Sequence, residues 1–264
     1  MVTFTIITCT YNAATELPRT LQSVHEQTYP YIEHLIIDGA SKDNTLLLLT
    51  EYKKKNMDAR GEHFINIVSE PDKGLYDAMN KSLIRATGDY ILFLNSGDSF
   101  HEKDTLNKIA AIINSADTTP AVVYGDTSIV DLAGNFIEKR HLSPPEKLTW
   151  KSFKKGMLVC HQSFFALTKL TKECFYNNKD YNFSADFDWC IRLMRIGTER
   201  NMPLLNSHII ITDYLKGGMT EKNHLKSLIE RYHIMAKYYG WMTASFYHGY
   251  FAIRAIKRHL QNYI

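Results

Sequence analysis

The sequence predicts an α/β fold in which helices flank a mostly parallel sheet, followed by a C-terminal helical extension. In the first half, short apolar runs typical of strands alternate with helical patterns. Polar loops follow these runs, and no internal repeat or low-complexity linker interrupts the alternation. Strand–loop–helix units in succession favour parallel strands joined by right-handed crossovers. The polar loops then gather at the carboxyl edge of the sheet, where open α/β proteins bind ligands.

Four β-rich runs are expected to form the strands of this sheet. In chain order they are Thr3–Thr10, Glu33–Asp38, Phe64–Ser69 and Tyr90–Leu94. The last run is short, apolar and flanked by glycines, which suits a strand buried on both faces. It stops abruptly at the polar sequence Asn-Ser-Gly-Asp of residues 95–98, which is either an ordinary turn or the start of a site.

A helical pattern follows each of these strands. The patterns are the segment with Leu17, Leu21 and Val24 on one face, the Leu-rich segment from Thr45, Leu75–Arg85, and Asp104–Asn114. Pro18 fits the first turn of the first helix. Asp43 or Ser41 can cap the second helix.

The second half of the chain is less regular. The segments expected there are a hairpin of Ala121–Val130 with Asn135–Lys139, a linker over His141–Lys155, a strand that carries His161, and a helix over Ala185–Arg195. Two further helical patterns, Lys222–Tyr239 and Met242–Tyr263, end the chain. We therefore expect a main domain over residues 1–220, with halves at about 1–130 and 131–220, and an extension over 221–264.

Composition excludes several classes of protein. The net charge of +3 arises from interleaved acids and bases, which argues against nucleic-acid binding. No apolar run approaches the length that spans a bilayer, and no signal-peptide pattern opens the chain. The four cysteines are widely spaced without a CxxC pair, as is usual for reduced thiols. We therefore expect a soluble cytoplasmic protein.

Side chains from different loops are predicted to share one crevice at the carboxyl edge. They are Tyr11, Asp38, Asp72, Lys73 and Asp98. An aromatic ring can stack on a base, a carboxylate can accept hydrogen bonds from a base or ribose, and a cation held by acids can bridge a diphosphate. Each residue also has a structural interpretation as a turn, cap or packing residue. The first strand is followed by TCTYNAATE rather than a glycine-rich phosphate loop, which argues against NAD or ATP as the ligand.

Four motifs in order make the chain resemble glycosyltransferase family 2. They are TCTYNA at residues 8–13, IDGASKDNT at 37–45, EPDKGLYDAMNKSLIRATGDYILFLNSGD at 70–98 and ADFDWCIRL at 185–193. The resemblance implies the GT-A fold, a Rossmann-like sheet, with a nucleotide-diphosphate sugar donor, a divalent cation and an inverting mechanism. The sequence of the third motif is similar to that of bacterial enzymes that assemble capsule, exopolysaccharide or O-antigen units.

The resemblance implies donor-binding and metal-binding residues. Donor binding falls to Thr8, Tyr11, Asn12, Asp38, Asp72, Lys73, Gly74, Asn95 and Ser96, with Asp38 reading the uracil ring. Asp98 matches the last acid of the motif that holds Mn²⁺ or Mg²⁺. Members of the family typically have LDSDD, where this chain has LNSGD, so two of three acids are missing. Metal affinity should therefore be modest, with much of the coordination supplied by the diphosphate.

The resemblance also implies the catalytic base. Asp186 takes the place of the family's catalytic aspartate, and Ala185 stands where the family has Glu. Asp188 is the second candidate for the base, and capping of the helix beside Ser184 is the structural alternative. His161 either contacts diphosphate or acceptor or is a buried core histidine. Gly217 and Gly218 resemble the loop that closes over the diphosphate.

The C-terminal helices leave two interpretations open. Aromatic residues mix with Lys, Arg and His there, so these helices either pack on the domain or contact an acidic membrane surface peripherally. The resemblance implies a transferase that moves a sugar, with UDP-sugar the expected donor, to a hydroxyl of an undecaprenyl-linked or oligosaccharide acceptor in bacterial surface polysaccharide synthesis. The alternative is a protein of the same fold that binds a nucleotide sugar and has lost transfer, because of the missing acids.

Overall fold

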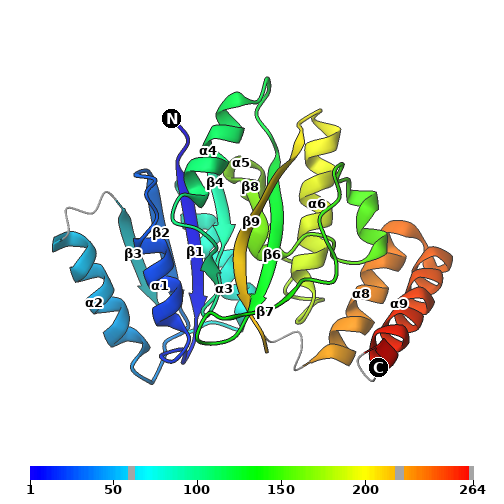
Figure 1. Cartoon of the computed structure of the whole chain (residues 1–264), viewed down its shortest axis with the longest axis horizontal. Helices are drawn as coiled ribbons and strands as arrows, with labels where there is room; N and C mark the ends of the chain where they lie inside the picture. Colours follow the sequence, from blue (N-terminus) through cyan, green and yellow to red (C-terminus); the bar gives the residue numbers. More distant parts are fainter. Residues whose placement is uncertain (59–62, 218–222, 262–264) are drawn as a thin grey trace.

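The computed structural model describes residues 1–58, 63–217 and 223–261. Its strands form one mixed sheet in the order β3-β2-β1-β4-β8-β6-β9-β5, with β7 paired to β6 (Figure 1). The strands are β1 (Phe4–Thr10), β2 (Ile32–Asp38), β3 (Phe64–Ser69), β4 (Tyr90–Phe93), β5 (Ser99–Phe100), β6 (Val122–Val130), β7 (Phe136–Lys139), β8 (Phe164–Leu167) and β9 (Leu204–Leu215). The α-helices are α1 (Leu17–His25), α2 (Thr45–Asp58), α3 (Leu75–Arg85), α4 (Thr105–Ser115), α5 (Thr168–Thr171), α6 (Ala185–Glu199), α8 (His224–Tyr239) and α9 (Trp241–Gln261).

The predicted parallel half of the sheet is confirmed. β1 pairs in parallel with β2 on one side and with β4 on the other, and β2 pairs in parallel with β3. Every residue of β1, β2 and β4 is buried, as expected of strands covered on both faces. The α/β fold class is therefore as predicted, and the loops after β1, β2, β3 and β4 lie at one edge.

The second half of the sheet is mixed, and two of its strands, β5 and β9, are absent from the sequence predictions. β8 is antiparallel to β4 and β6, whereas β9 is parallel to β6. The residues of β9 do not alternate between buried and exposed, and its backbone is interrupted at His208, which has a φ of 57°. The β6–β9 register shifts on either side of Asp126. A strand without regular alternation leaves no clean signal in the sequence.

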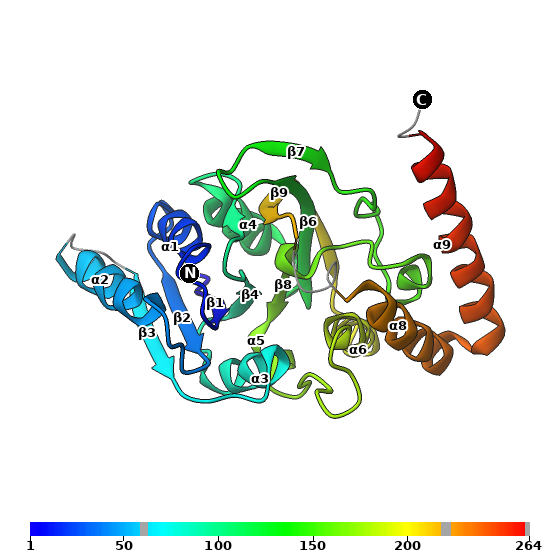
Figure 2. The same ribbon diagram turned by 90° about the horizontal axis from the view of Figure 1, so that it is seen from below.

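Helices cover the two faces of the sheet in separate sets. α1, α2 and α4 pack their apolar faces on one side, in clusters that include Leu17, Leu49 and Ile109. α3 and α6 pack on the other side in the largest cluster, which includes Met79 and Trp189. The sheet is therefore the middle layer of three, as Figure 2 shows from below.

The C-terminal helices lie beyond this layered body. α8 packs against α6, and α9 packs on α8 and on the 3₁₀ helix η1 (Trp150–Lys155) (Figures 1 and 2). The expected linker over His141–Lys155 is thus partly wrong, because its last six residues form η1, whose first turn is closed by a capping box between Thr149 and Ser152. None of the described helices is long and apolar enough to cross a membrane.

The position of His161 also differs from the sequence prediction. His161–Ser163 form the 3₁₀ turn η2, and strand β8 begins only at Phe164. The turn places the imidazole at the end of β4, where its ring stacks on Phe93 with 5.0 Å between centroids. A strand would have sent alternate side chains to opposite faces of the sheet.

His34 on β2 makes the fold sensitive to acid. Its ring is buried, contacts the hydroxyl oxygens of Thr8 at 3.0 Å and Tyr52 at 2.8 Å, and burial lowers its pKa to about 3. The unfolded state therefore binds more protons than the folded state between about pH 3 and about 6.5, and folding stability falls as pH falls through that window.

We expect His34→Gln to reduce the slope of unfolding free energy against pH by about 1 kcal/mol per pH unit between pH 6 and pH 4.5. Urea unfolding over this range measures it, and an unchanged slope would contradict a neutral buried His34.

Candidate active site

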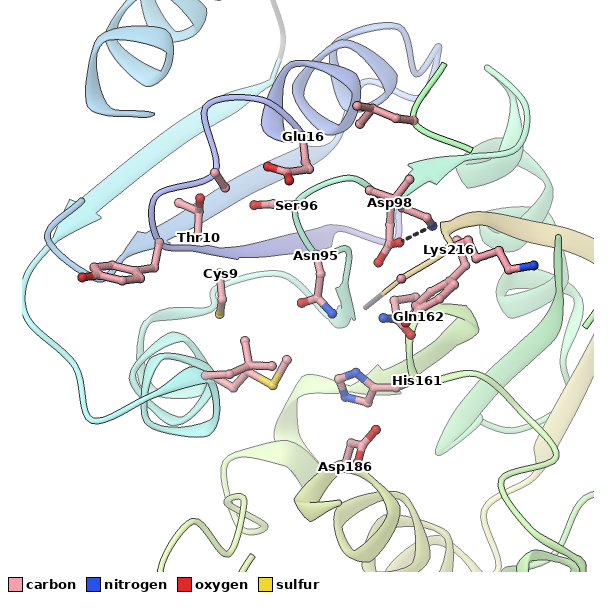
Figure 3. A pocket seen from close by; sticks show the side chains of 18 of the residues that line it. Cys9, Thr10, Glu16, Asn95, Ser96, Asp98, His161, Gln162, Asp186 and Lys216 are labelled. Carbon is pink, nitrogen blue, oxygen red and sulfur yellow. Dashed lines mark hydrogen bonds between the residues drawn. The ribbon is translucent and has the colours of Figure 1, made fainter. Parts of the chain in front are cut away.

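A cavity of about 820 Å³ opens at the carboxyl edge of β1 and β4. Its lining combines residues after both strands with residues of α3, η2, α6 and the end of β9. Eight of the predicted site residues line it: Tyr11, Asn12, Asn95, Ser96, Asp98, His161, Asp186 and Gly217. Gly218 lies outside the described residues. The gathering of separate loops at one edge is therefore observed, and Figure 3 shows Asn95 and Asp98 on one side of the cavity and Asp186 on the other.

Two predicted donor residues lie beneath the cavity rather than in its lining. The carboxylate of Asp38 is buried and accepts hydrogen bonds from Ser41 N at 3.0 Å, Ser41 Oγ at 2.5 Å and Ser69 Oγ at 2.6 Å. Thr8 is also buried, and its hydroxyl donates to the carbonyl of Leu94 at 2.8 Å. Both side chains tie neighbouring loops together, so the structure gives them positioning contacts.

The loop after β3 lies beside Tyr11 at the outer end of the cavity. A Cβ added to Gly39 would come within 2.5 Å of Asp72 Oδ2 and 3.3 Å of the Tyr11 ring, so Asp72 and Tyr11 flank this glycine. Asp72 Oδ1 accepts a hydrogen bond from Gly74 N at 2.8 Å, while Lys73 and Gly74 are exposed. The Tyr11 ring is 59% exposed, which leaves a face available for stacking.

The predicted cation motif places one buried carboxylate in the cavity. Asp98 Oδ1 accepts a hydrogen bond from Leu215 N at 2.9 Å, and burial raises the pKa of Asp98 to about 7 despite that bond. Two buried atoms next to it, Asn95 Oδ1 and Ser96 Oγ, have no hydrogen-bond partner within the described ranges. These oxygens are hard ligands of the kind that Mg²⁺ and Mn²⁺ prefer, so the residues fit a divalent cation with one charged protein ligand.

The missing acid at Gly97 has a steric explanation. Gly97 has a φ of 96°, and a Cβ there would meet Leu215 Cδ2 at 2.5 Å. An aspartate at this position would be strained and would clash with β9. Among the described residues, no group of three or more His, Cys, Asp or Glu side chains could hold a metal ion alone. Further oxygen ligands would have to come from a diphosphate or from water.

Asp186 enters the cavity from the first turn of α6. Its Oδ1 accepts hydrogen bonds from Phe187 N at 2.9 Å and from the Tyr76 hydroxyl at 3.1 Å. The preceding Ala185 is completely buried, so the family's glutamate could not be accommodated there without rearrangement. In Figure 3 the carboxylate points toward the cavity next to His161.

Asp188 faces away from the cavity. Its buried carboxylate accepts hydrogen bonds from Arg192 Nε at 2.7 Å and from the Tyr238 hydroxyl at 2.7 Å, and Lys237 Nζ lies at 3.7 Å. These partners come from α6 itself and from α8. Asp188 therefore ties the two helices together, which favours a structural role over that of a second base.

A second carboxylate from α8 secures the segment before Asp186. Glu230 accepts hydrogen bonds from the backbone N–H groups of Asn182, Phe183 and Ser184 at 2.8–2.9 Å. These N–H groups lie in the segment that leads into α6, and a carboxylate near the N-terminus of a helix is also favoured by the helix dipole. The C-terminal extension thus contributes directly to where α6 begins.

His161 is both a core histidine and a residue of the cavity. Its Nε2 lies 2.5 Å from the Tyr176 hydroxyl, and burial lowers its pKa to about 4, although Asp186 opposes that shift. The ring is therefore neutral at physiological pH. A neutral imidazole can exchange hydrogen bonds with a ligand but cannot balance the charge of a diphosphate.

Sequence reasoning missed several residues that line the cavity. They are Cys9, Glu16, Gln162, Tyr214 and Lys216, with others of the same lining. Gln162 and Lys216 directly adjoin the predicted His161 and Gly217, so proximity in sequence was the available signal. Neither Glu16 nor Tyr214 belongs to one of the recognised motifs, and β9, which carries Tyr214, was not predicted from the sequence. Lys216 Nζ forms an ion pair with Glu138 at 3.1 Å at the cavity rim.

A cavity at the carboxyl edge of an α/β sheet, with carboxylates on two sides, is the arrangement expected of a glycosyltransferase of the GT-A fold. The chain matches the family model for Glycosyl transferase family 2 over residues 5–175. A PGL/p-HBAD biosynthesis glycosyltransferase of Mycobacterium bovis (strain BCG / Pasteur 1173P2) is 32% identical over 232 residues, covering 85% of this chain and 83% of that protein. The chain therefore belongs to glycosyltransferase family 2.

Solved structures show the same fold. TarS 1-349 of S. aureus in complex with UDP-GlcNAc superposes with a TM-score of 0.66 at 19% identity, covering 88% of this chain and 64% of that one. The mannosyltransferase PcManGT of Pyrobaculum calidifontis, in complex with GDP-Man and Mn²⁺, gives a TM-score of 0.61 at 17% identity and covers 93% and 74%. These two neighbours bind different nucleotides, so the fold alone does not select the base. The chain spans less than two thirds of the TarS fragment.

Proposed function

We propose that this glycosyltransferase transfers a sugar with inversion from a UDP-sugar to a hydroxyl of a lipid-linked or oligosaccharide acceptor in the assembly of a bacterial surface polysaccharide. The observation that carries the proposal is the placement of Asp98 and Asp186 on opposite sides of one cavity. One carboxylate is then available to the leaving diphosphate through a cation, and the other to the acceptor. Inversion requires this arrangement, because attack and departure occur on opposite faces of the sugar.

The proposed reaction moves one proton and exchanges one bond. The acceptor oxygen forms a bond to the anomeric carbon while the bond from that carbon to the diphosphate oxygen breaks. Asp186 takes the hydroxyl proton through Oδ2, to which no hydrogen bond is described within residues 1–58, 63–217 and 223–261. A divalent cation held by Asp98, Asn95 and Ser96 would neutralise charge that develops on the diphosphate. Tyr11 and Asp72 flank the outer end of the cavity, where we place the nucleobase.

The alternative function is a nucleotide-sugar-binding protein without transfer. It draws support from the loss of two acids at the cation motif and of one acid at Ala185. A panel of UDP-GlcNAc, UDP-GalNAc, UDP-glucose, UDP-galactose and GDP-mannose, assayed for nucleotide release with Mn²⁺ and n-octyl glycosides, separates the two functions. Turnover of one donor supports the enzyme, whereas tight UDP binding without turnover supports the alternative.

Asp186→Asn tests the base. The amide keeps the size of the carboxylate but cannot accept the proton, so we expect nucleotide release to fall roughly 10²- to 10⁴-fold. Affinity for UDP, measured by calorimetry, should change little because the nucleotide lies elsewhere in the cavity.

Asp188→Asn is the matched control for the base on the same helix. It should lower the melting temperature, because it weakens the contacts of Asp188 with Arg192 and Tyr238, but it should have little effect on activity. Full turnover in Asp186→Asn would refute the assignment of the base.

Asp98→Asn tests the cation site. Removing the one charged ligand should weaken UDP binding in the presence of Mn²⁺ by about tenfold or more, with a much smaller loss in the presence of EDTA. Calorimetric titrations of UDP under both conditions measure the difference, and electron paramagnetic resonance of free Mn²⁺ gives the affinity for the metal directly. Equal losses with and without Mn²⁺ would show that Asp98 does not hold the cation.

We also propose that α9 attaches the protein peripherally to an anionic membrane surface, at the inner face of the cytoplasmic membrane. Met242, Phe246, Ile253 and Ile256 are all exposed and recur at helical spacing, which places them on one face of α9. Figure 2 shows α9 at the outer edge of the molecule, away from the sheet. The chain contains no acidic residue after Glu230, whereas Arg254 and exposed Lys257 lie on α9. An apolar face with basic neighbours fits a bilayer that contains acidic lipids.

Replacement of Phe246 and Ile253 together by serine tests this attachment. Co-sedimentation with vesicles of phosphatidylglycerol and phosphatidylcholine should fall about tenfold or more, since two large apolar side chains no longer enter the interface. Ile84→Ser is the control, because Ile84 is similarly exposed but lies on α3. Unchanged co-sedimentation would overturn the membrane assignment and show that this face does not contact the membrane. A dimer detected by light scattering that dissociates in the double variant would overturn it in favour of self-association.

A further inference from the structure

The motif GLYDAMNK, residues 74–81, lies on α3 and presents two different sets of contacts. Asp77 and Lys81, one turn apart, hold the preceding loop: Asp77 Oδ2 accepts from Lys73 N at 3.1 Å, and Lys81 Nζ donates to the Pro71 carbonyl at 2.7 Å. Tyr76 and Asn80, also one turn apart, contact the acceptor half of the chain. The helix therefore links the loop beside the nucleobase to the segment that carries Asp186.

The Asn80 amide fixes the backbone next to the cavity. Its Nδ2 donates to the Tyr176 carbonyl at 3.0 Å, and its Oδ1 accepts from Tyr176 N at 2.7 Å. The Tyr176 ring stacks on Tyr76 with 5.6 Å between centroids and on Trp189 with 4.8 Å. Tyr76 is thus held between α3 and α6 in a packed environment, with its hydroxyl aimed at one carboxylate oxygen of Asp186.

We infer that Tyr76 is a positioning residue for Asp186, which rests on the proposed role of that carboxylate as base. Tyr76 and the Phe187 N–H both donate to Oδ1, so they fix the rotation of the carboxylate and direct Oδ2 toward the acceptor. Without the hydroxyl, one backbone bond would hold Oδ1, and the carboxylate could turn about its Cβ–Cγ bond. A loosely held base loses rate because fewer complexes have the reacting atoms aligned.

A double-mutant cycle of Tyr76→Phe and Asp186→Asn tests this inference. Phenylalanine keeps the stack on Tyr176 and removes only the hydroxyl. In the wild-type background we expect kcat for nucleotide release, with the fastest donor of the panel, to fall about tenfold, while KM for the donor changes little. The acid limb of the pH–kcat profile should move to higher pH, since the carboxylate loses a hydrogen bond to its charged form. In the Asp186→Asn background the same change should cause little further loss.

Tyr90→Phe is the matched control. Tyr90 is likewise a buried tyrosine whose hydroxyl donates one hydrogen bond, to the Pro120 carbonyl at 2.7 Å, and it lies outside the cavity. The melting temperature should fall by a similar amount in both Phe variants, but only Tyr76→Phe should change kcat. Equal loss of kcat from Tyr76→Phe in both backgrounds, or an unmoved pH profile, would overturn the inference while leaving the base assignment intact. Full activity of Asp186→Asn alone, or turnover of no donor, would overturn both.

Discussion

The parallel pairing of β1 with β4 is the constraint on which the rest of the site depends. Ile7 pairs with Phe93 at the end of β4, and β1 continues to Thr10, so both strands end at the same edge and residues that follow each of them line the cavity. Burial on both faces fixes this register, because a shift of one residue would turn every side chain to the opposite face. The Leu94 N–H donates to the Ile7 carbonyl at 2.8 Å and extends the pairing to the edge of the cavity. The core therefore positions the loops that follow β1 and β4.

Two departures from the family's acidic motifs, at Gly97 and Ala185, follow from packing. Gly97 lies against Leu215, and Ala185 is enclosed at the start of α6, so neither position has room for a carboxylate. The structure instead concentrates its polar contacts on one acid at each side: Leu215 N holds Asp98, while Tyr76 and Phe187 N hold Asp186. A site with fewer acids has less repulsion between its carboxylates. The hydrogen bonds to Asp98 and Asp186 orient the two that remain.

The first half of the chain could be predicted from its sequence because local signals there agree with the tertiary structure. Apolar runs end at polar loops, and parallel strands bring those loops together, so the sequence alone places Tyr11, Asn95 and Asp98 at one edge of the sheet. The second half could not be predicted as well. β9 lacks regular alternation and is interrupted at His208, and η2 turns His161 out of a strand. Tyr76 looked like one apolar residue in a helix, and only the meeting of α3 with α6 gives its hydroxyl a partner. Contacts between segments distant in sequence leave no periodic signal.

The three hydrogen bonds that Glu230 accepts from residues 182–184 make the C-terminal extension part of the structure that positions Asp186, the proposed base. Asp188 adds a second tie between the same two helices through Tyr238. A segment with these contacts cannot be treated as a detachable anchor, since cutting the chain before α8 would release the beginning of the helix that carries Asp186. Engineering of this enzyme therefore has its natural boundary after α8 rather than before it. For the same reason, a change in the position of α9 would reach Asp186 through one intervening helix, α8.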